Sequence, residues 1–200
     1  MVKTMVRTSL PIQTFQTSTW HFKQAVRYLK MGATIAYPTE AVYGLGCDPT
    51  NEKAVTRLLT LKQRTWHKGL ILIAADYTQL SSFLEPLTPE LEERIFKTWP
   101  GAITWLIPAK PDVPYWLRGQ STQLAVRVTA HPIAATLCQH WNGPLVSTSA
   151  NLSKGAAAQT ALQVRHIFKQ QIDYIVPGAL GKRQRPSEIR DALTNTVLRI

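Results

Sequence analysis

The chain has 200 residues, of which 44% are apolar and 18% charged, a composition that is typical of a folded globular protein and excludes a disordered one. Its longest apolar run covers residues 70–75, far short of the about 20 residues that a membrane-spanning helix needs, so we expect no membrane association. Lys and Arg number 23 against 12 Asp and Glu, and the resulting net charge of +11 predicts an anionic partner.

The first half of the chain is predicted to alternate between helices and strands, after a short lead-in strand over residues 1–15. In chain order we expect a helix over residues 18–31, a strand over 34–37, a helix over 52–64 and a buried strand over 70–75. Asp76 and Thr88 are predicted to cap two further helices, because both side chains can accept a hydrogen bond from a first-turn amide.

The second half continues this alternation. We expect strands over residues 102–107, 124–128, 145–147, 174–176 and 197–200, with helices over 132–141 and 161–171 and loops over 110–122 and 178–186. Helices that alternate with strands predict an α/β or α+β sheet with helices packed on it. With no repeat and no linker in the sequence, residues 1–200 are expected to form one domain.

The common catalytic and cofactor-binding motifs are absent from the sequence. There is no HExxH motif, the histidines show no repeated metal-ligand spacing, and no GxSxG elbow supports a serine hydrolase that uses Ser147 or Ser149. Cys47 and Cys138 are too few for a disulfide framework and lack CxxC spacing, which predicts a reducing, cytoplasmic compartment. We therefore expect no metal site built by the protein and no tightly bound cofactor.

Polar residues stand instead at the ends of predicted elements. Thr39 and Glu40 follow the first predicted strand, where they either border a ligand or cap a helix in a tight turn. Lys62, Arg64 and Lys68 cluster after a predicted helix. These cations either satisfy the negative helix C-terminus or grip phosphate groups, as a guanidinium fork beside a point charge does.

Hydroxyl and amide side chains follow another predicted strand. Ser147, Ser149 and Asn151 are separated by small residues, which let a ligand approach the backbone. Their side chains and amides either bind a phosphate or carboxylate, as a backbone nest does, or cap a helix.

Arg127 interrupts an otherwise apolar predicted strand and needs an anion there, because an unpaired charge is costly to bury. An internal Asp or Glu is the ordinary partner, but no acid occurs between Asp112 and Asp173. The sequence therefore predicts a ligand carboxylate or phosphate. Because no acid precedes Glu40 either, the excess positive charge is expected on one basic face or in one basic cavity.

Several of these residues lie in motifs that occur in a fixed order. The motifs are AYPTEAVYGLGCDP at 36–49, LKQR at 61–64 with KGLILIA at 68–74, WPGAIT at 99–104, LAVRV at 124–128, PLVSTSANLS at 144–153 and PSEIRD at 186–191. With them the chain resembles the YrdC-type L-threonylcarbamoyladenylate synthases, in their short bacterial, TsaC-like form, from about Trp20 to Arg199. The resemblance implies a YrdC-like twisted mixed sheet with helices packed on it and a large basic concave cavity.

The resemblance also implies a reaction that needs no protein nucleophile. These enzymes condense L-threonine with bicarbonate, and the carbamate attacks the α-phosphorus of ATP, which releases pyrophosphate and forms L-threonylcarbamoyl-AMP. Mg²⁺ is expected to arrive with ATP. Partner proteins then transfer the threonylcarbamoyl group to the adenosine next to the anticodon of tRNA, giving threonylcarbamoyladenosine, and tRNA itself is a further expected partner on the basic face.

Site residues are implied by the same resemblance. Lys62 and Arg64 are expected to be catalytic and to contact the ATP phosphates, and Ser149, Asn151 and Arg199 to bind the nucleotide. The threonine pocket is expected to contain Thr39, Arg127, Ser147 and Ser187. Because both sets share one cavity, the resemblance leaves the division of residues between them open.

An alternative of another class is a non-catalytic module that binds double-stranded RNA or tRNA, since a net charge of +11 suits a phosphate backbone. Modules that read RNA bases usually show exposed aromatic side chains or an RNP-like motif. Such a motif is not formed by the aromatic residues Trp66, Trp99, Trp105, Tyr115 and Trp116 in the sequence, which disfavours this alternative.

Overall fold

The computed structural model describes residues 17–153, 155–185 and 187–199, so the lead-in strand predicted over residues 1–15 lies outside the described residues. Its helices are α1 (Thr19–Lys30), α2 (Glu52–Leu61), the 3₁₀ turn η1 (Trp66–Lys68), α3 (Pro89–Phe96), α4 (Tyr115–Arg118), α5 (Pro132–Trp141) and α6 (Ala161–Phe168). Its strands are β1 (Ile35–Pro38), β2 (Tyr43–Gly46), β3 (Ile71–Ala74), β4 (Ile103–Pro108), β5 (Gln123–Val128), β6 (Leu145–Ser149), β7 (Tyr174–Ile175), β8 (Glu188–Asp191) and β9 (Val197–Arg199).

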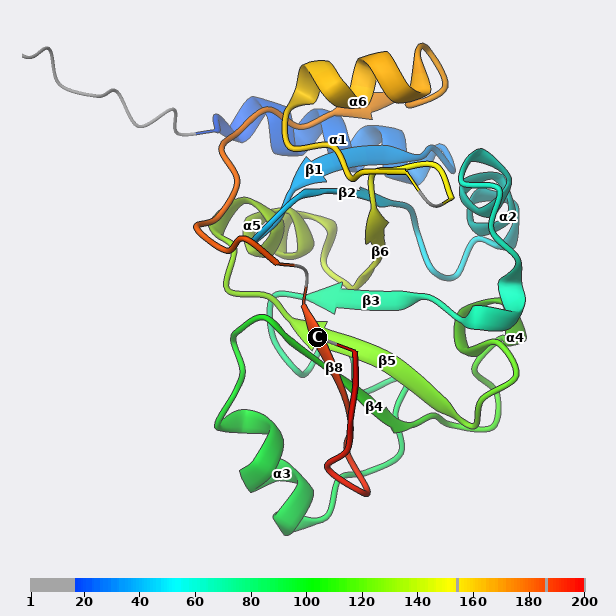
Figure 1. The fold of residues 1–200 in the computed structure, drawn as a ribbon, viewed down its shortest axis with the longest axis vertical. Helices are drawn as coiled ribbons and strands as arrows, with labels where there is room; N and C mark the ends of the chain where they lie inside the picture. The colour runs from blue at the N-terminus through cyan, green and yellow to red at the C-terminus, as the bar shows by residue number, and fades with distance from the viewer. Residues whose placement is uncertain (1–16, 154, 186, 200) are drawn as a thin grey trace, which may run out of the picture.

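The described strands form one mixed sheet in the order β7-β1-β2-β6-β3-β5-β4-β8-β9. In Figure 1 strand β3 crosses the middle of the molecule, with β1 and β2 above it and β5, β4 and β8 below it. Strand β6 joins the two halves, because its first part pairs with β3 and its last part, Thr148 and Ser149, pairs with β2. The α/β sheet predicted from the sequence is confirmed, and its parallel and antiparallel pairs make it mixed.

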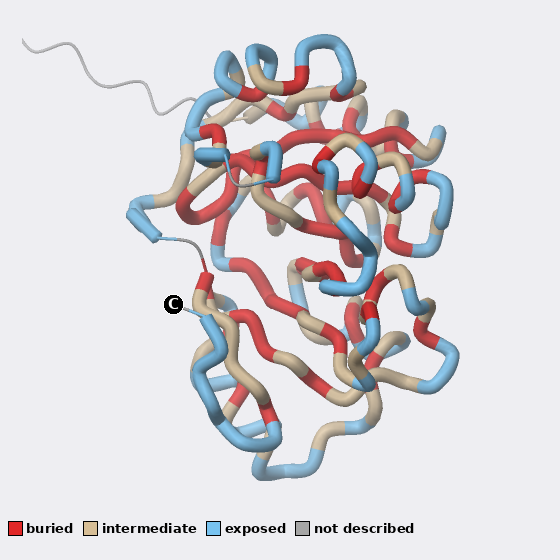
Figure 2. The backbone as a smooth tube through the Cα atoms, turned by 45° about the vertical axis from the view of Figure 1, so that its right-hand side comes forward, coloured by how far each residue is buried: buried red, intermediate tan, exposed pale blue. Residues whose placement is uncertain are grey.

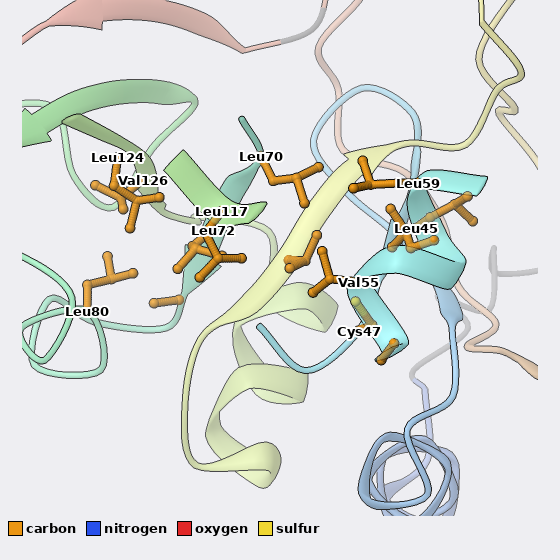
Figure 3. Close-up of a cluster of buried hydrophobic side chains, with 14 of the residues drawn as sticks. Leu45, Cys47, Val55, Leu59, Leu70, Leu72, Leu80, Leu117, Leu124 and Val126 are labelled. Carbon is orange, nitrogen blue, oxygen red and sulfur yellow. The ribbon is translucent and has the colours of Figure 1, made fainter. Parts of the chain in front are cut away.

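Alternating strand residues supply two apolar cores, one on each face of the sheet. Leu72 of β3 and Val146 of β6 belong to one core. Their neighbours Ile73 and Leu145 belong to the other. Helices α1 and α5 cover the face that carries Ile73, whereas α2, α4 and α6 pack on the opposite face. Figure 2 shows long buried stretches of the chain in the interior, and Figure 3 shows α2 side chains packed against Leu45 of β2.

Several element predictions are wrong. Asp76 accepts a hydrogen bond from the amide of Gln79 as a helix cap would, but the backbone bonds that follow join residues three apart, Leu80 to Tyr77 and Phe83 to Leu80, so the segment forms a series of turns and no α-helix. Strands β2 and β8 were not expected as separate strands, and the loop predicted over 110–122 contains α4. No helix in the described part of the chain combines the length and apolar character that a membrane crossing requires.

Gly46 of β2 is needed for the close approach between β2 and β6. A Cβ at this position would lie 2.5 Å from the carbonyl oxygen of Val146 and 2.8 Å from the Tyr37 ring. We expect Gly46→Ala to lower the free energy of unfolding by about 1–3 kcal/mol, because this space is already filled. Urea denaturation measures the change. Gly143→Ala is the control, since its Cβ would meet only Trp141 at 3.6 Å, and equal stability of the two variants would contradict the packing argument.

Candidate active site

A cavity of about 420 Å³ gathers most of the predicted site residues at the ends of strands from distant parts of the sequence. The predicted residues that line it are Thr39, Arg64, Arg127, Ser147, Ser149, Ser187 and Arg199. The other two, Lys62 and Asn151, do not line the cavity but contact the lining residue Ser149. The two expected pockets therefore meet in one hollow.

Strand register explains why these side chains meet. Ile71 of β3 lies opposite both Ala125 of β5 and Ser147 of β6, and all three line the cavity. Side chains two residues apart on a strand share a face, so Arg127 lies on the same face as Ala125. Ile73, opposite Arg127, is packed in the core beneath α1 and α5. The cavity therefore begins where these two helices no longer cover the sheet.

The expectation that Arg127 has no internal acidic partner is wrong. The turn between β1 and β2 brings in Glu40 from far earlier in the chain, and Glu40 Oε2 lies 3.3 Å from a terminal nitrogen of Arg127. Glu40 Oε1 accepts a hydrogen bond of 2.6 Å from Thr129. Arg127 Nε is nevertheless buried without a hydrogen-bond partner among the described residues, so the pairing with Glu40 does not satisfy the whole guanidinium.

The two alternatives involving helix caps are also wrong. Residues 39–42 connect β1 to β2, and the Thr39 hydroxyl donates to the carbonyl of Val42 at 2.7 Å within this turn. After β6 the next helix is α6, which is capped by Thr160. Ser149 instead donates to Asn151 Oδ1 at 2.7 Å, so these side chains shape the turn that borders the cavity.

Lys62 supports this turn from within the protein. Its side chain is buried, and its ammonium donates to the carbonyl oxygens of Ser149 and Asn151 and to Asn151 Oδ1. These three acceptors match the three protons of an ammonium group. Burial, with a smaller effect of the charge on Arg64, lowers the pKa of Lys62 to about 8. In this structure Lys62 therefore organises the turn that carries Ser149 toward the cavity.

Arg64 and Arg199 bring further positive charge to the cavity. Arg64 donates to the carbonyl of Gly69 at 2.9 Å, and its buried Nε has no hydrogen-bond partner among the residues described. Arg199 donates to the carbonyl of Ser187 at 2.9 Å. Partial burial lowers the pKa of both guanidinium groups, and that of Arg199 is lowered further by the charges of Arg127 and Arg64. Crowded cations of this kind favour an anionic ligand.

The charge of the lining is strongly unequal. Within the described residues its cations are Arg64, Lys68, Arg118, Arg127 and Arg199, and its only carboxylate is that of Glu40. Sequence reasoning allowed that Glu40 borders a ligand but did not pair it with Arg127, which is distant in the sequence, and it gave no site role to Arg118, which lies in a predicted loop. No group of three His, Cys, Asp or Glu side chains suited to a metal ion occurs in the part of the chain that the structure covers.

An aromatic group lies beside the cavity. Trp66 and Tyr115 are exposed, with ring centroids 5.0 Å apart, and Tyr115 lies 5.4 Å from Trp116. His67 lines the cavity and stacks on Trp66 at 4.0 Å. The sequence has no RNP-like motif, but the fold brings Trp66 and His67 beside Tyr115 and Trp116 from a later part of the chain.

Comparisons with known proteins agree with this architecture. The family model Sua5_yciO_yrdC, described as "Telomere recombination", matches residues 27–200. The threonylcarbamoyl-AMP synthase of Nitrosococcus oceani is 56% identical over 180 residues, which cover 90% of this chain and 97% of the relative. That of Coxiella burnetii strain RSA 493 is 48% identical over 182 residues, which cover 91% of this chain and 98% of the relative.

Solved structures show the same fold. Sua5 of P. abyssi, in a crystal structure with L-threonine, has a TM-score of 0.82 and 31% identity, covering 87% of this chain and 51% of that chain. YciO of E. coli has a TM-score of 0.78 and 26% identity, covering 89% of this chain and 87% of that one. The chain thus spans nearly the full length of the two curated relatives but about half of Sua5.

Proposed function

Because the chain belongs to the Sua5/YciO/YrdC family, we propose that it makes L-threonylcarbamoyl-AMP from L-threonine, bicarbonate and ATP, with release of pyrophosphate. The observation that carries the proposal is the convergence of Arg64, Arg127 and Arg199 with serine hydroxyls on one cavity. Relatives named threonylcarbamoyl-AMP synthase, about half identical over nearly the whole chain, favour this enzyme over a non-catalytic RNA-binding module.

The nucleotide end of the cavity is assigned to Arg64, Arg199, Ser149 and the turn that Lys62 and Asn151 shape. The carbamate oxygen attacks the α-phosphorus of ATP while the bond to the pyrophosphate oxygen breaks, so charge develops on the phosphate oxygens. Guanidinium groups that are already in place stabilise this charge without reorganising. ATP enters as its magnesium complex, and the metal ion supplies the remaining positive charge. No covalent intermediate with the protein is needed.

The amino-acid end is assigned to Arg127, Thr39, Ser147 and Ser187. The guanidinium of Arg127, which lines the cavity, is suited to the substrate carboxylate, because charge-assisted hydrogen bonds from a guanidinium are strong. Ser187 accepts a hydrogen bond of 3.1 Å from the buried Thr104, which fixes its hydroxyl on the cavity wall. Holding the threonine beside the nucleotide converts an encounter of separate reactants into a reaction within one complex.

An experiment that omits one reactant at a time tests this function. We expect release of pyrophosphate only when ATP, Mg²⁺, L-threonine and bicarbonate are all present, and mass spectrometry should detect L-threonylcarbamoyl-AMP. Release of pyrophosphate without threonine would contradict the proposed reaction.

The product serves the threonylcarbamoyladenosine modification of tRNA in the cytoplasm and passes to the proteins that transfer the threonylcarbamoyl group. A direct contact with tRNA is part of the proposal. Helix α1 exposes Lys23, Arg27 and Lys30 and carries no acid, and Trp66 and Tyr115 offer exposed rings beside the basic cavity. Cations bind phosphates and exposed rings stack on unpaired bases.

The salt dependence of tRNA binding tests this contact. We expect the affinity measured by fluorescence anisotropy to fall steeply with salt, because each phosphate contact releases counterions and adds about 0.7–0.9 to the slope of log K against log salt. A variant with Lys23, Arg27 and Lys30 changed to alanine should show a smaller slope. A flat salt profile for the unchanged protein would reject the tRNA contact.

A further inference from the structure

Glu40 supplies the only carboxylate on the described lining of a cavity that otherwise carries cations. Its side chain is 12% exposed, and it faces the Arg127 guanidinium, which is 8% exposed, across 3.3 Å. Each Glu40 oxygen has one partner, Thr129 for Oε1 and Arg127 for Oε2. Because an ionised carboxylate has about four acceptor positions, Glu40 retains capacity to accept hydrogen bonds from a ligand.

The backbone of Glu40 is held firmly in place. Its carbonyl oxygen accepts a hydrogen bond of 3.1 Å from the amide of Arg183, and the preceding carbonyl, of Thr39, accepts one of 3.0 Å from Gly181. A Cβ at Gly181 would lie 2.7 Å from the Glu40 carbonyl oxygen, so the two segments are in close contact. The carboxylate is therefore positioned before any ligand arrives.

We propose that Glu40 binds the α-ammonium group of the amino-acid substrate, so that the Glu40–Arg127 pair recognises the zwitterion. The inference rests on the proposed function, in which the Arg127 guanidinium takes the substrate carboxylate. An α-amino acid carries its ammonium and carboxylate on one carbon, and a neighbouring acid and guanidinium offer the complementary charges in the same arrangement. Because the zwitterion is neutral overall, its binding adds no net charge to the buried Glu40–Arg127 pair.

The remaining charges of the cavity make this role specific to Glu40. Arg64, Lys68, Arg118 and Arg199 repel an ammonium group, so a substrate amine has no other charged partner on the described lining. With the carboxylate at Arg127 and the amine at Glu40, the reacting nitrogen has a fixed direction relative to the nucleotide end. Glu40 is then a determinant of amino-acid binding and orientation.

Two ligands distinguish contact with the amine from a merely supporting role of Glu40. Isothermal titration calorimetry compares L-threonine with (R)-3-hydroxybutanoate, which keeps the carboxylate and the hydroxyl but lacks the amine. For Glu40→Gln we expect the affinity for L-threonine to fall at least about tenfold, because a charged hydrogen bond is lost. The affinity for hydroxybutanoate should change less than about twofold. Glu93→Gln, which removes an exposed carboxylate paired with Lys97, is the matched control and should alter neither affinity.

The other outcomes overturn the inference. A parallel loss of both ligands would show that Glu40 acts only by positioning Arg127, and an unchanged affinity for L-threonine would show no role in binding. If thermal melting shows that Glu40→Gln does not fold, Glu40→Asp, which keeps the charge on a shorter side chain, should give the same selective loss. If the unchanged protein fails to bind L-threonine, the proposed function falls with the inference, whereas normal binding without the selective loss removes only the inference.

Discussion

Replacing Lys62 with alanine is expected to lower kcat/KM for ATP at least about tenfold. The change removes a buried positive charge next to Arg64 and leaves the carbonyl oxygens of Ser149 and Asn151 without their donor. A lost charged hydrogen bond costs about 1.5–3 kcal/mol, which corresponds to a factor of roughly 10 to 150. Steady-state assays of pyrophosphate release measure the loss. Unchanged kinetics in a folded Lys62→Ala protein would remove Lys62 from the site.

The protonation of Lys62 predicts a pH dependence for the same parameter. Burial lowers its pKa to about 8, so the ammonium is charged below that pH and becomes neutral above it. We therefore expect kcat/KM for ATP to decline as the pH rises through about 8. Lys62→Arg stays charged over this range, so whatever activity it retains should not show the decline. A decline of the same shape in both proteins would assign it to another group.

Replacing Arg127 is expected to have a comparably large effect, but on the other substrate. Arg127→Ala should raise the KM for L-threonine at least about tenfold while changing that for ATP less than about threefold, because Arg127 lines the cavity together with Ser147. The same kinetic assay, run with each substrate varied in turn, gives both constants. A larger increase in the KM for ATP would place Arg127 at the nucleotide end instead.

Stability must be measured alongside, because Arg127→Ala leaves Glu40 buried without its ion-pair partner. Removing one member of a buried pair costs about 3–5 kcal/mol of folding free energy. Arg127→Lys keeps the charge and loses the planar fork, so it should retain more stability while still binding L-threonine weakly. Normal threonine binding by Arg127→Lys would show that only the charge matters.

Local sequence signals predicted most of the helices and strands, and the failures have physical reasons. Pro132 is the first residue of α5, and Asn142, in the left-handed conformation, follows its last residue. These two residues end the helix where the apolar pattern predicts its limits. Strand β8 was missed because Glu188–Asp191 carries three charges in four residues and pairs only at the far side of the sheet. No α-helix follows Asp76 although its carboxylate caps the segment as predicted, because the backbone hydrogen bonds there join residues three apart and not four.

For the site, motifs predicted which residues meet but not how they are paired. Seven of the nine expected residues line one cavity. The resemblance implied such a cavity, shared by the ATP and threonine residues. The partner of Arg127 was not predictable from local composition, because the turn that carries Glu40 reaches it only through the sheet. The three acceptors of Lys62 likewise lie far from it in the sequence, at the last residue of β6 and in the turn that follows, and the pairing of β6 with β2 and β3 places them.

A crystal structure of the protein with L-threonine and a non-hydrolysable ATP analogue tests most directly whether one cavity holds both substrates. We predict the threonine carboxylate within hydrogen-bond distance of Arg127 and the phosphates within that distance of Arg64 and Arg199, with the carboxylate of Glu40 at the amine. Amino acid and nucleotide bound on separate surfaces would contradict the account.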